Sequence, residues 1–190
     1  MRLDLDGKVA LVSGGSKGIG LAAARHLLAE GCRVAIVSRA QANIDAALAE
    51  LGGDVIGIAA DLGDAAQAEA ALDAIEAQLG GVEILVNSAG AAVQTLPADM
   101  TPAVWRAAMD AKYFTYINLI DPAIKRMGAR GRGVVVNVIG NGGKVATATH
   151  IAGGAANAAL MLVTAGLARD YAPMGVRVVG INPGMTETDR

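Results

Sequence analysis

Hydrophobic and polar positions follow two recurring patterns along the chain. Short runs rich in valine and isoleucine are separated by longer alanine-rich segments, in which apolar residues recur at helical spacing. The short runs predict six strands: Val9–Ser13, Arg33–Val37, Val55–Ala59, Ile84–Val86, Val134–Ile139 and Val176–Gly180. The longer segments predict five helices: Gly18–Glu30, Gln41–Leu51, Asp64–Leu79, Thr101–Met127 and His150–Tyr171.

The order of these elements indicates the fold class. The predicted strands are continuous apolar runs, which is typical of strands buried on both faces of a parallel sheet. Because strands and helices alternate, we expect an α/β protein with a doubly wound parallel sheet of the Rossmann-like type. No linker, charge run, low-complexity tract or repeat interrupts the 190 residues, so the sequence predicts a single domain over residues 1–190.

Charge and cysteine content narrow the classes of partner and site. The chain has a formal net charge of −2 and no cluster of lysine and arginine, which argues against a nucleic-acid partner. Its single cysteine, Cys32, excludes an intramolecular disulfide and fits a reducing cytoplasm. Since only two histidines accompany this cysteine, we expect no metal site.

Hydrophobic residues make up 53% of the chain, which raises the question of a membrane segment. The most apolar stretch, Ile151–Ala168, contains Asn157, Thr164 and several glycines, whereas a span needs roughly 20 predominantly apolar residues. The first residues, Met1–Asp6, carry acids where a signal peptide needs an apolar run. We therefore expect a buried helix, no membrane association and a cytoplasmic location.

A glycine-rich turn follows the first predicted strand and leads directly into a helix. It reads Ser13-Gly14-Gly15-Ser16-Lys17-Gly18-Ile19-Gly20. Glycines let the backbone turn tightly and approach a pyrophosphate, whose charge is met by the free N–H groups of the helix N-terminus. A glycine-rich turn without a ligand is the alternative. The preceding strand and the following helix favour phosphate binding.

The spacing G-x-x-x-G-x-G resembles the glycine motif of the short-chain dehydrogenase/reductase family. Further motifs follow later strands and are similar to those of the family: Asp61-Leu62, Asn87-Ser88-Ala89-Gly90, and Asn182-Pro183-Gly184 with Thr186 and Thr188. The resemblance implies a nicotinamide dinucleotide cofactor at the carboxyl ends of the strands. The residues it assigns to this cofactor are Gly14, Ser16, Lys17 and Ile19 at the pyrophosphate, Asp61 and Leu62 at the adenine, Asn87, Ala89 and Gly90 along the cofactor, and Pro183, Gly184, Thr186 and Thr188 beside the nicotinamide.

The second predicted strand is followed by Ser38-Arg39, where an acid would bind the ribose 2′-hydroxyl of NAD. The guanidinium of Arg39 can instead hold a 2′-phosphate by charge-assisted hydrogen bonds. Lys17 adds a second cation on the same side. This pair resembles the basic pair of NADP-preferring family members, so we expect NADP(H) rather than NAD(H). The alternative is that both cations are ordinary exposed loop charges.

The catalytic residues of the family are absent from this chain. The family uses a Ser, a Tyr-x-x-x-Lys and an Asn, and these positions fall at Gly140, His150, Gly154 and Lys112, with a shortened loop between Gly140 and Thr149. We expect His150 to be the proton donor, since imidazole is a competent donor near neutral pH. We expect Lys112 to point into the space left by Gly154 and hold the ribose hydroxyls or an oxyanion.

Other roles for these two residues remain open. His150 also fits a cap or surface residue at a helix start, and Lys112 a solvated helix charge. Three more polar residues could reach the cleft, and the sequence does not rank them: Tyr113, Tyr116 and Lys144.

The sequence thus predicts an NADP(H)-dependent oxidoreductase of the short-chain dehydrogenase type, acting on a small carbonyl or alcohol. One alternative is a catalytically inactive dinucleotide-binding protein, either a redox sensor or a non-catalytic subunit, and a weaker one is a non-redox enzyme with the same fold. Helices 101–127 and 150–171 are apolar around much of their circumference, and the family commonly pairs through them, so we expect a homodimer or homotetramer. Because the last motif runs to Arg190, where the family continues, we expect a C-terminal truncation.

Overall fold

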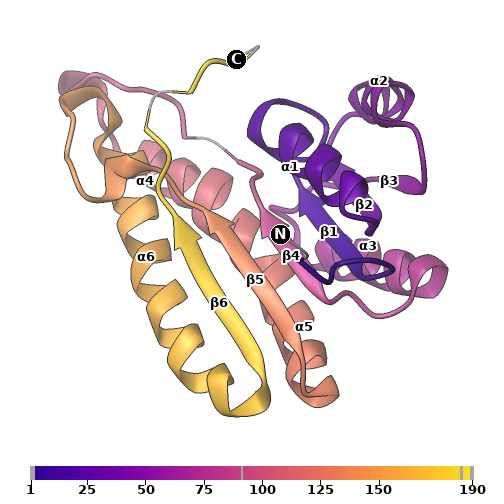
Figure 1. Ribbon diagram of the computed structural model, residues 1–190. Helices are drawn as coiled ribbons and strands as arrows, with labels where there is room; N and C mark the ends of the chain where they lie inside the picture. Colours follow the sequence, from indigo (N-terminus) through magenta and orange to yellow (C-terminus); the bar gives the residue numbers. More distant parts are fainter. Residues whose placement is uncertain (1–2, 91, 185, 189–190) are drawn as a thin grey trace.

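The computed structural model describes residues 3–90, 92–184 and 186–188. Their central feature is one six-stranded sheet in the order β3-β2-β1-β4-β5-β6 (Figure 1). All neighbouring strands are parallel. This order is that of a doubly wound Rossmann-type sheet, whose topological switch point lies between β1 and β4. The predicted fold class is therefore confirmed. The strands are β1 (Val9–Ser13), β2 (Arg33–Ser38), β3 (Val55–Ala59), β4 (Ile84–Asn87), β5 (Gly133–Val138) and β6 (Val176–Ile181).

Helices cover the sheet on both faces because successive strand residues point to opposite sides. Leu11 of β1 packs into the core shared with α3, α5 and α6, whereas its neighbour Val12 packs into the core shared with α1 and α2. In Figure 1, α6 lies beside the edge strand β6, and α1 and α2 lie towards the opposite edge of the sheet, which is formed by β3. The helices are α1 (Gly18–Ala29), α2 (Gln41–Leu51), α3 (Ala65–Leu79), α4 (Pro102–Met109), α5 (Thr115–Arg130) and α6 (Ile151–Tyr171).

The helix predicted over Thr101–Met127 is wrong as a single α-helix. The structure divides it into α4 and α5, joined by a π-helical turn at Asp110–Phe114. The wider turn leaves carbonyls without their usual partners, and the hydroxyl of Thr115 donates to two of them, at Asp110 (3.1 Å) and Ala111 (3.2 Å). Such bulges often occur at functional sites because they turn a side chain out of helical register.

The helix α6 is covered on one side only in the single chain. Leu160 and Thr164 are buried against the sheet, whereas Leu162 is 76% exposed and Ile151 is 40% exposed. The exposed side is the one that the predicted pairing with a second subunit would cover. Within the described residues, one helix, 148–174, is long and apolar enough to cross a membrane by length and composition alone. Its packing against β6 and α4 leads us to interpret it as a core helix.

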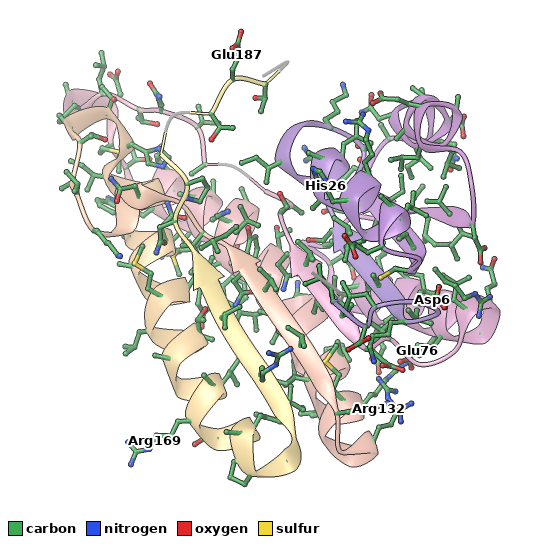
Figure 2. The ribbon with its side chains drawn as sticks, in the orientation of Figure 1. Asp6, His26, Glu76, Arg132, Arg169 and Glu187 are labelled. Atoms are coloured by element: carbon green, nitrogen blue, oxygen red, sulfur yellow. The ribbon has the colours of Figure 1, made fainter. Side chains whose placement is uncertain are left out.

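Different residues lie at the end of the sheet where the strands begin and at the end where they finish (Figure 2). Glu76 lies at the end where the strands begin, and Glu187 lies beyond the end where they finish. At the first end, the carboxylate of Glu76 accepts hydrogen bonds from Arg126 (2.9 Å) and Arg130 (3.0 Å) of α5. This cluster ties α3 to α5. The residues predicted to carry the chemistry belong to the other end.

Candidate functional site

The glycine-rich loop after β1 is packed so tightly that its glycines cannot carry side chains. Gly14 has a φ of +67°, and a Cβ atom placed on it would lie 2.8 Å from the Cα of Ala89. A Cβ on Gly20, in the first turn of α1, would lie 2.3 Å from the carbonyl oxygen of Gly14. The loop and the start of α1 therefore form a shallow backbone cradle at the switch point, next to the segment that follows β4.

A chain of buried polar side chains holds that neighbouring segment in place. The hydroxyl of Ser13 accepts hydrogen bonds from the N–H groups of Ser88 (3.2 Å) and Ala89 (3.3 Å). The amide of Asn87 donates to the side chain of Asn137 (3.0 Å), which donates in turn to the hydroxyl of Thr164 (2.9 Å). These side chains link β1, β4, β5 and α6. The sequence analysis missed the roles of Asn137 and Thr164.

The residues predicted to bind the 2′-phosphate lie on adjacent loops. The hydroxyl of Ser16, after β1, donates a 2.9 Å hydrogen bond to the hydroxyl of Ser38, at the end of β2. Lys17 and Arg39, the next residue on each loop, are both exposed. The structure thus places the two cations on neighbouring loops.

The residues predicted at the adenine are placed differently from one another. Asp61 is exposed, and its carboxylate accepts a hydrogen bond from the N–H of Gly63 (3.0 Å). Leu62 is only 4% exposed and belongs to the core. Its carbonyl accepts a hydrogen bond from Asn118 of α5 (3.0 Å). Asp61, rather than the Leu62 side chain, is therefore available at the surface here.

Thr188, in the last predicted motif, lies next to the glycine loop. The methyl group of Thr188 lies 3.3 Å from the position that a Cβ on Gly18 would occupy. The backbone N–H of Asn141 donates to the carbonyl of Pro183 (3.2 Å), which fixes the start of this motif over the end of β5. Thr186 is exposed, and its hydroxyl donates to the carbonyl of Gly184 (3.3 Å).

A cleft of about 390 Å³ opens at the carboxyl ends of β4 and β5. It brings together Lys112 and His150, the two predicted catalytic residues, with Gly90, Pro183 and Gly184 of the predicted cofactor set. Glycines make up much of its wall, including Gly140, Gly142 and Gly153. Within the described residues, no group of three or more His, Cys, Asp and Glu side chains could hold a metal ion. The polar side chains that line the cleft are those of Gln94, Lys112, His150 and Asn157.

Lys112 lies on the π-helical turn and is 8% exposed. Its ammonium group donates hydrogen bonds to the hydroxyl of Tyr116 (2.8 Å) and to the carbonyl of Val138 (3.1 Å). Tyr116 is fully buried and donates to the same carbonyl; its burial raises its pKa, so it is a poor proton donor. The turn and the end of β5 thus fix the ammonium at the cleft wall.

The predicted use of the space at Gly154 is wrong. A Cβ on Gly154 would lie 2.7 Å from the carbonyl oxygen of Gly142, so the backbone already closes that direction. Lys112 instead bonds to Tyr116 and Val138, as described above.

His150 immediately precedes α6, and its ring lies over Gly153. A Cβ on Gly153 would be 2.3 Å from Cε1 of the imidazole. Two buried side-chain atoms at this wall have no hydrogen-bond partner within the described residues: Nδ1 of His150 and Oδ1 of Asn157. Asn157 is 5% exposed and lines the same cleft. The cleft wall therefore carries polar atoms without a hydrogen-bond partner in the described part of the chain.

Comparison with known proteins identifies the family. The family model described as short chain dehydrogenase matches residues 8–190. The chain belongs to the short-chain dehydrogenase family. The D-threitol dehydrogenase of Mycolicibacterium smegmatis is 36% identical over 188 residues, which cover 97% of this chain and 72% of the relative. The 3-oxoacyl-(acyl-carrier-protein) reductase FabG of Vibrio cholerae is 33% identical over 187 residues, covering 98% and 77%.

A solved structure agrees with this assignment. The crystal structure of a variant of actinorhodin polyketide ketoreductase with NADPH has a TM-score of 0.92 to this chain. It is 29% identical in sequence, and the match covers 96% of this chain and 72% of that one. The fold is therefore that of the short-chain dehydrogenase family.

Within this family, the structure favours a different register for the Tyr-x-x-x-Lys positions. The sequence analysis placed them at His150 and Gly154. In the structure, Gly153 and Asn157 have the same spacing and both line the cleft, whereas Gly154 faces the backbone of Gly142. Gly153 and Asn157 thus fit these positions better. The only signal in the sequence was the presence of Asn157 in the most apolar helix, where a polar residue needs a reason.

Proposed function

We propose that this short-chain dehydrogenase binds NADP(H) and transfers a hydride between this cofactor and a small carbonyl or alcohol. The observation that carries the proposal is the cleft at the carboxyl ends of β4 and β5, which is lined by Lys112 and His150 together with predicted cofactor residues. Family membership supports the redox class, since the named relatives are a dehydrogenase and a reductase. We continue to expect that the protein is located in the cytoplasm and has no nucleic-acid partner.

The backbone cradle fits a dinucleotide. A side chain on Gly14 would collide with the backbone of Ala89, and one on Gly20 with the carbonyl of Gly14, so only glycines allow the loop to fold this tightly against the start of α1. The N–H groups at the start of α1 would hold the pyrophosphate, as helix N-termini do. When bound, the cofactor supplies or accepts the hydride.

The preference for NADP(H) rests on Lys17 and Arg39. Both are exposed on the adjacent loops that are joined by the Ser16–Ser38 hydrogen bond. A phosphate between these loops would be held by two cations, whereas a ribose hydroxyl there would find no carboxylate on either residue. The ketoreductase with a similar structure was solved with NADPH, which supports the same preference.

The chain must also supply a proton to the carbonyl oxygen during reduction. His150 lines the cleft, and an imidazolium side chain is a suitable general acid for this proton transfer. Lys112, fixed by Tyr116 and Val138, would hold ribose hydroxyls or the developing negative charge on oxygen. In the direction of alcohol oxidation, neutral His150 would accept the proton.

A dinucleotide-binding protein without turnover is the second candidate. The glycines at positions 140 and 153 favour it, because neither can donate a hydrogen bond from a side chain. The two functions are distinguished by measuring NADPH consumption with a panel of small carbonyl compounds, together with a direct titration of NADPH binding. Carbonyl-dependent consumption supports the enzyme. Binding without consumption supports the second candidate, and the absence of binding contradicts both.

We also propose that the chain pairs with further copies through residues 101–127 (α4, the π-helical turn and most of α5) and through α6. The apolar side chains of Trp105, Phe114 and Leu162 are 39%, 43% and 76% exposed in the single chain. Contact with a second copy would bury this surface. Light scattering in solution tests the proposal: a dimer or tetramer is expected, and a monomer at micromolar concentration would contradict it.

A further inference from the structure

Gly153, in the first turn of α6, leaves a space that the imidazole of His150 fills. A Cβ atom placed on Gly153 would lie 2.3 Å from Cε1 and 2.5 Å from Nε2 of that ring. Both distances are far below van der Waals contact, so the observed ring position and a side chain at residue 153 exclude one another. Gly153 and His150 also line the same cleft.

The ring is enclosed from other directions as well. A Cβ on Gly142 would lie 3.2 Å from Cδ2 of His150, so the ring is inserted between two glycines. The methyl group of Ala92 lies 2.9 Å from the Cβ position of Gly153 and closes the same space. The backbone N–H of His150 donates to the carbonyl of Thr147 (3.1 Å), which fixes the backbone position from which the imidazole extends.

The other glycines of α6 show that helix packing alone does not explain Gly153. At Gly154, the space is closed by a backbone atom, the carbonyl oxygen of Gly142 at 2.7 Å. At Gly166, among the described residues, no atom apart from the adjacent residues and the surrounding backbone of α6 lies within 4 Å of the Cβ position. At Gly153, the three nearest atoms all belong to side chains, and the two nearest belong to the histidine of the cleft. The absence of a side chain at residue 153 therefore affects the position that the His150 ring can take.

We propose that Gly153 is a positioning residue. Because it has no side chain, the imidazole of His150 can occupy the space beside it in the cleft, in reach of the substrate. This inference rests on the proposed function, in which His150 exchanges a proton with the substrate. A methyl group at residue 153 would push the ring out of its slot. The cofactor cradle would be unaffected, since it is built from β1, α1 and the segment after β4.

The placement of the ring can be measured by NMR without any turnover. His150 shares the chain with only one other histidine, His26, which is exposed on α1. In the unmutated protein we expect a nuclear Overhauser contact between the Cε1 proton of His150 and the α protons of Gly153. In Gly153→Ala, the Cε1 resonance of His150 should shift and that of His26 should not. Absence of the contact in the unmutated protein, or an unshifted His150 resonance in Gly153→Ala, would overturn the proposal.

Kinetics tests whether the placement matters for the reaction. Gly153→Ala should lower kcat at least about tenfold, because a positioned acid contributes about 10²–10⁴-fold, and should change NADPH affinity less than about twofold. Gly166→Ala is the matched control on the same helix and should retain the unmutated kcat. A displaced ring with an unchanged kcat would overturn the positioning role. If the unmutated protein shows no turnover, the proposed function fails. The NMR measurement then still tests whether the His150 ring lies against Gly153.

Thermal unfolding provides a test that can still be used if Gly153→Ala is destabilised. If Gly153→Ala lowers Tm because its methyl group meets the imidazole, the same substitution should lower Tm much less in a His150→Ala background. Additive effects on Tm in the two backgrounds would show that residues 153 and 150 do not interact, and would overturn the proposal.

Discussion

The ammonium of Lys112 donates a 2.8 Å hydrogen bond to the hydroxyl of Tyr116, one turn further along the same helical segment. The ammonium also lies 4.4 Å from the centre of the Tyr116 ring. Both residues bond to the carbonyl of Val138 at the end of β5. The π-helical turn is thus joined to the sheet at the wall of the cleft, and the position of the cation depends on a buried phenol.

Removing this cation should affect both binding and turnover. Lys112→Met keeps most of the apolar stem but deletes the group proposed to contact the ribose or the oxyanion. We expect weaker NADPH binding and a lower kcat, measured by titration and by steady-state kinetics. Tyr116→Phe is the companion variant, and it should leave the cation bound to Val138 and have the smaller effect. Unchanged NADPH affinity and unchanged kcat in Lys112→Met would contradict the proposed role.

The cofactor preference should depend on Arg39. Arg39→Asp replaces a cation with an anion that repels a 2′-phosphate, and loss of one charge-assisted hydrogen bond should weaken NADPH binding at least about tenfold. NADH binding should be maintained or improved. Arg169→Asp, in the last turn of α6 (Figure 2), is the control and should change neither affinity. Equal affinities of the unmutated protein for NADPH and NADH would contradict the assignment.

The buried polar chain across the sheet should stabilise the fold and the segment after β4. Asn137→Ala removes the side chain that joins Asn87 to Thr164, and leaves buried polar groups without partners. The expected loss is about 1–3 kcal/mol of the free energy of unfolding, which denaturant titration measures. A variant as stable as the unmutated protein would show that the chain of hydrogen bonds contributes little.

The cluster at the other end of the sheet should make stability depend on pH. Burial of the Glu76 carboxyl raises its pKa, but hydrogen bonds from Arg126 and the Val82 N–H and the charges of both arginines outweigh this, so its pKa is lowered from 4.5. Because the folded state then binds a proton less readily than the unfolded state, the stabilisation is complete above the unfolded pKa. It is lost as the pH falls through the lowered folded value.

The corresponding measurement is Tm as a function of pH for the unmutated protein and Glu76→Gln. The variant should have a lower Tm at pH 7, and the difference should shrink as the solution is acidified. Each 1 kcal/mol corresponds to about 2–4 °C for a chain of this size. A difference in Tm that is constant with pH would show that ionisation of Glu76 does not contribute.

The sequence predicted the sheet well because its strands are local apolar runs bounded by glycines and polar residues. It also placed the glycine loop and the Asn87–Gly90 segment at the carboxyl ends of strands, where short-range pattern and fold class agree. The π-helical turn at Asp110–Phe114 was not predictable, since the turn is an extra residue in an otherwise helical pattern.

The site itself was predicted less completely. The position of the His150 ring depends on Gly153, Gly142 and Ala92, which come together only through tertiary packing. The spacing of Gly153 and Asn157 could have been recognised as a second register for the Tyr-x-x-x-Lys positions. Nothing in the sequence alone shows that Gly154 faces the Gly142 backbone.

The central claim is that the cleft transfers a hydride with His150 as the proton donor. The most direct test is the initial rate of carbonyl-dependent NADPH consumption, measured side by side for the unmutated protein and His150→Ala. We predict consumption by the unmutated protein and a rate about one hundredfold lower in the variant, with nearly unchanged NADPH affinity, because the proton moves only in the transition state. Equal rates for the two proteins would contradict the role of His150, and tight NADPH binding without consumption by either would contradict the enzyme.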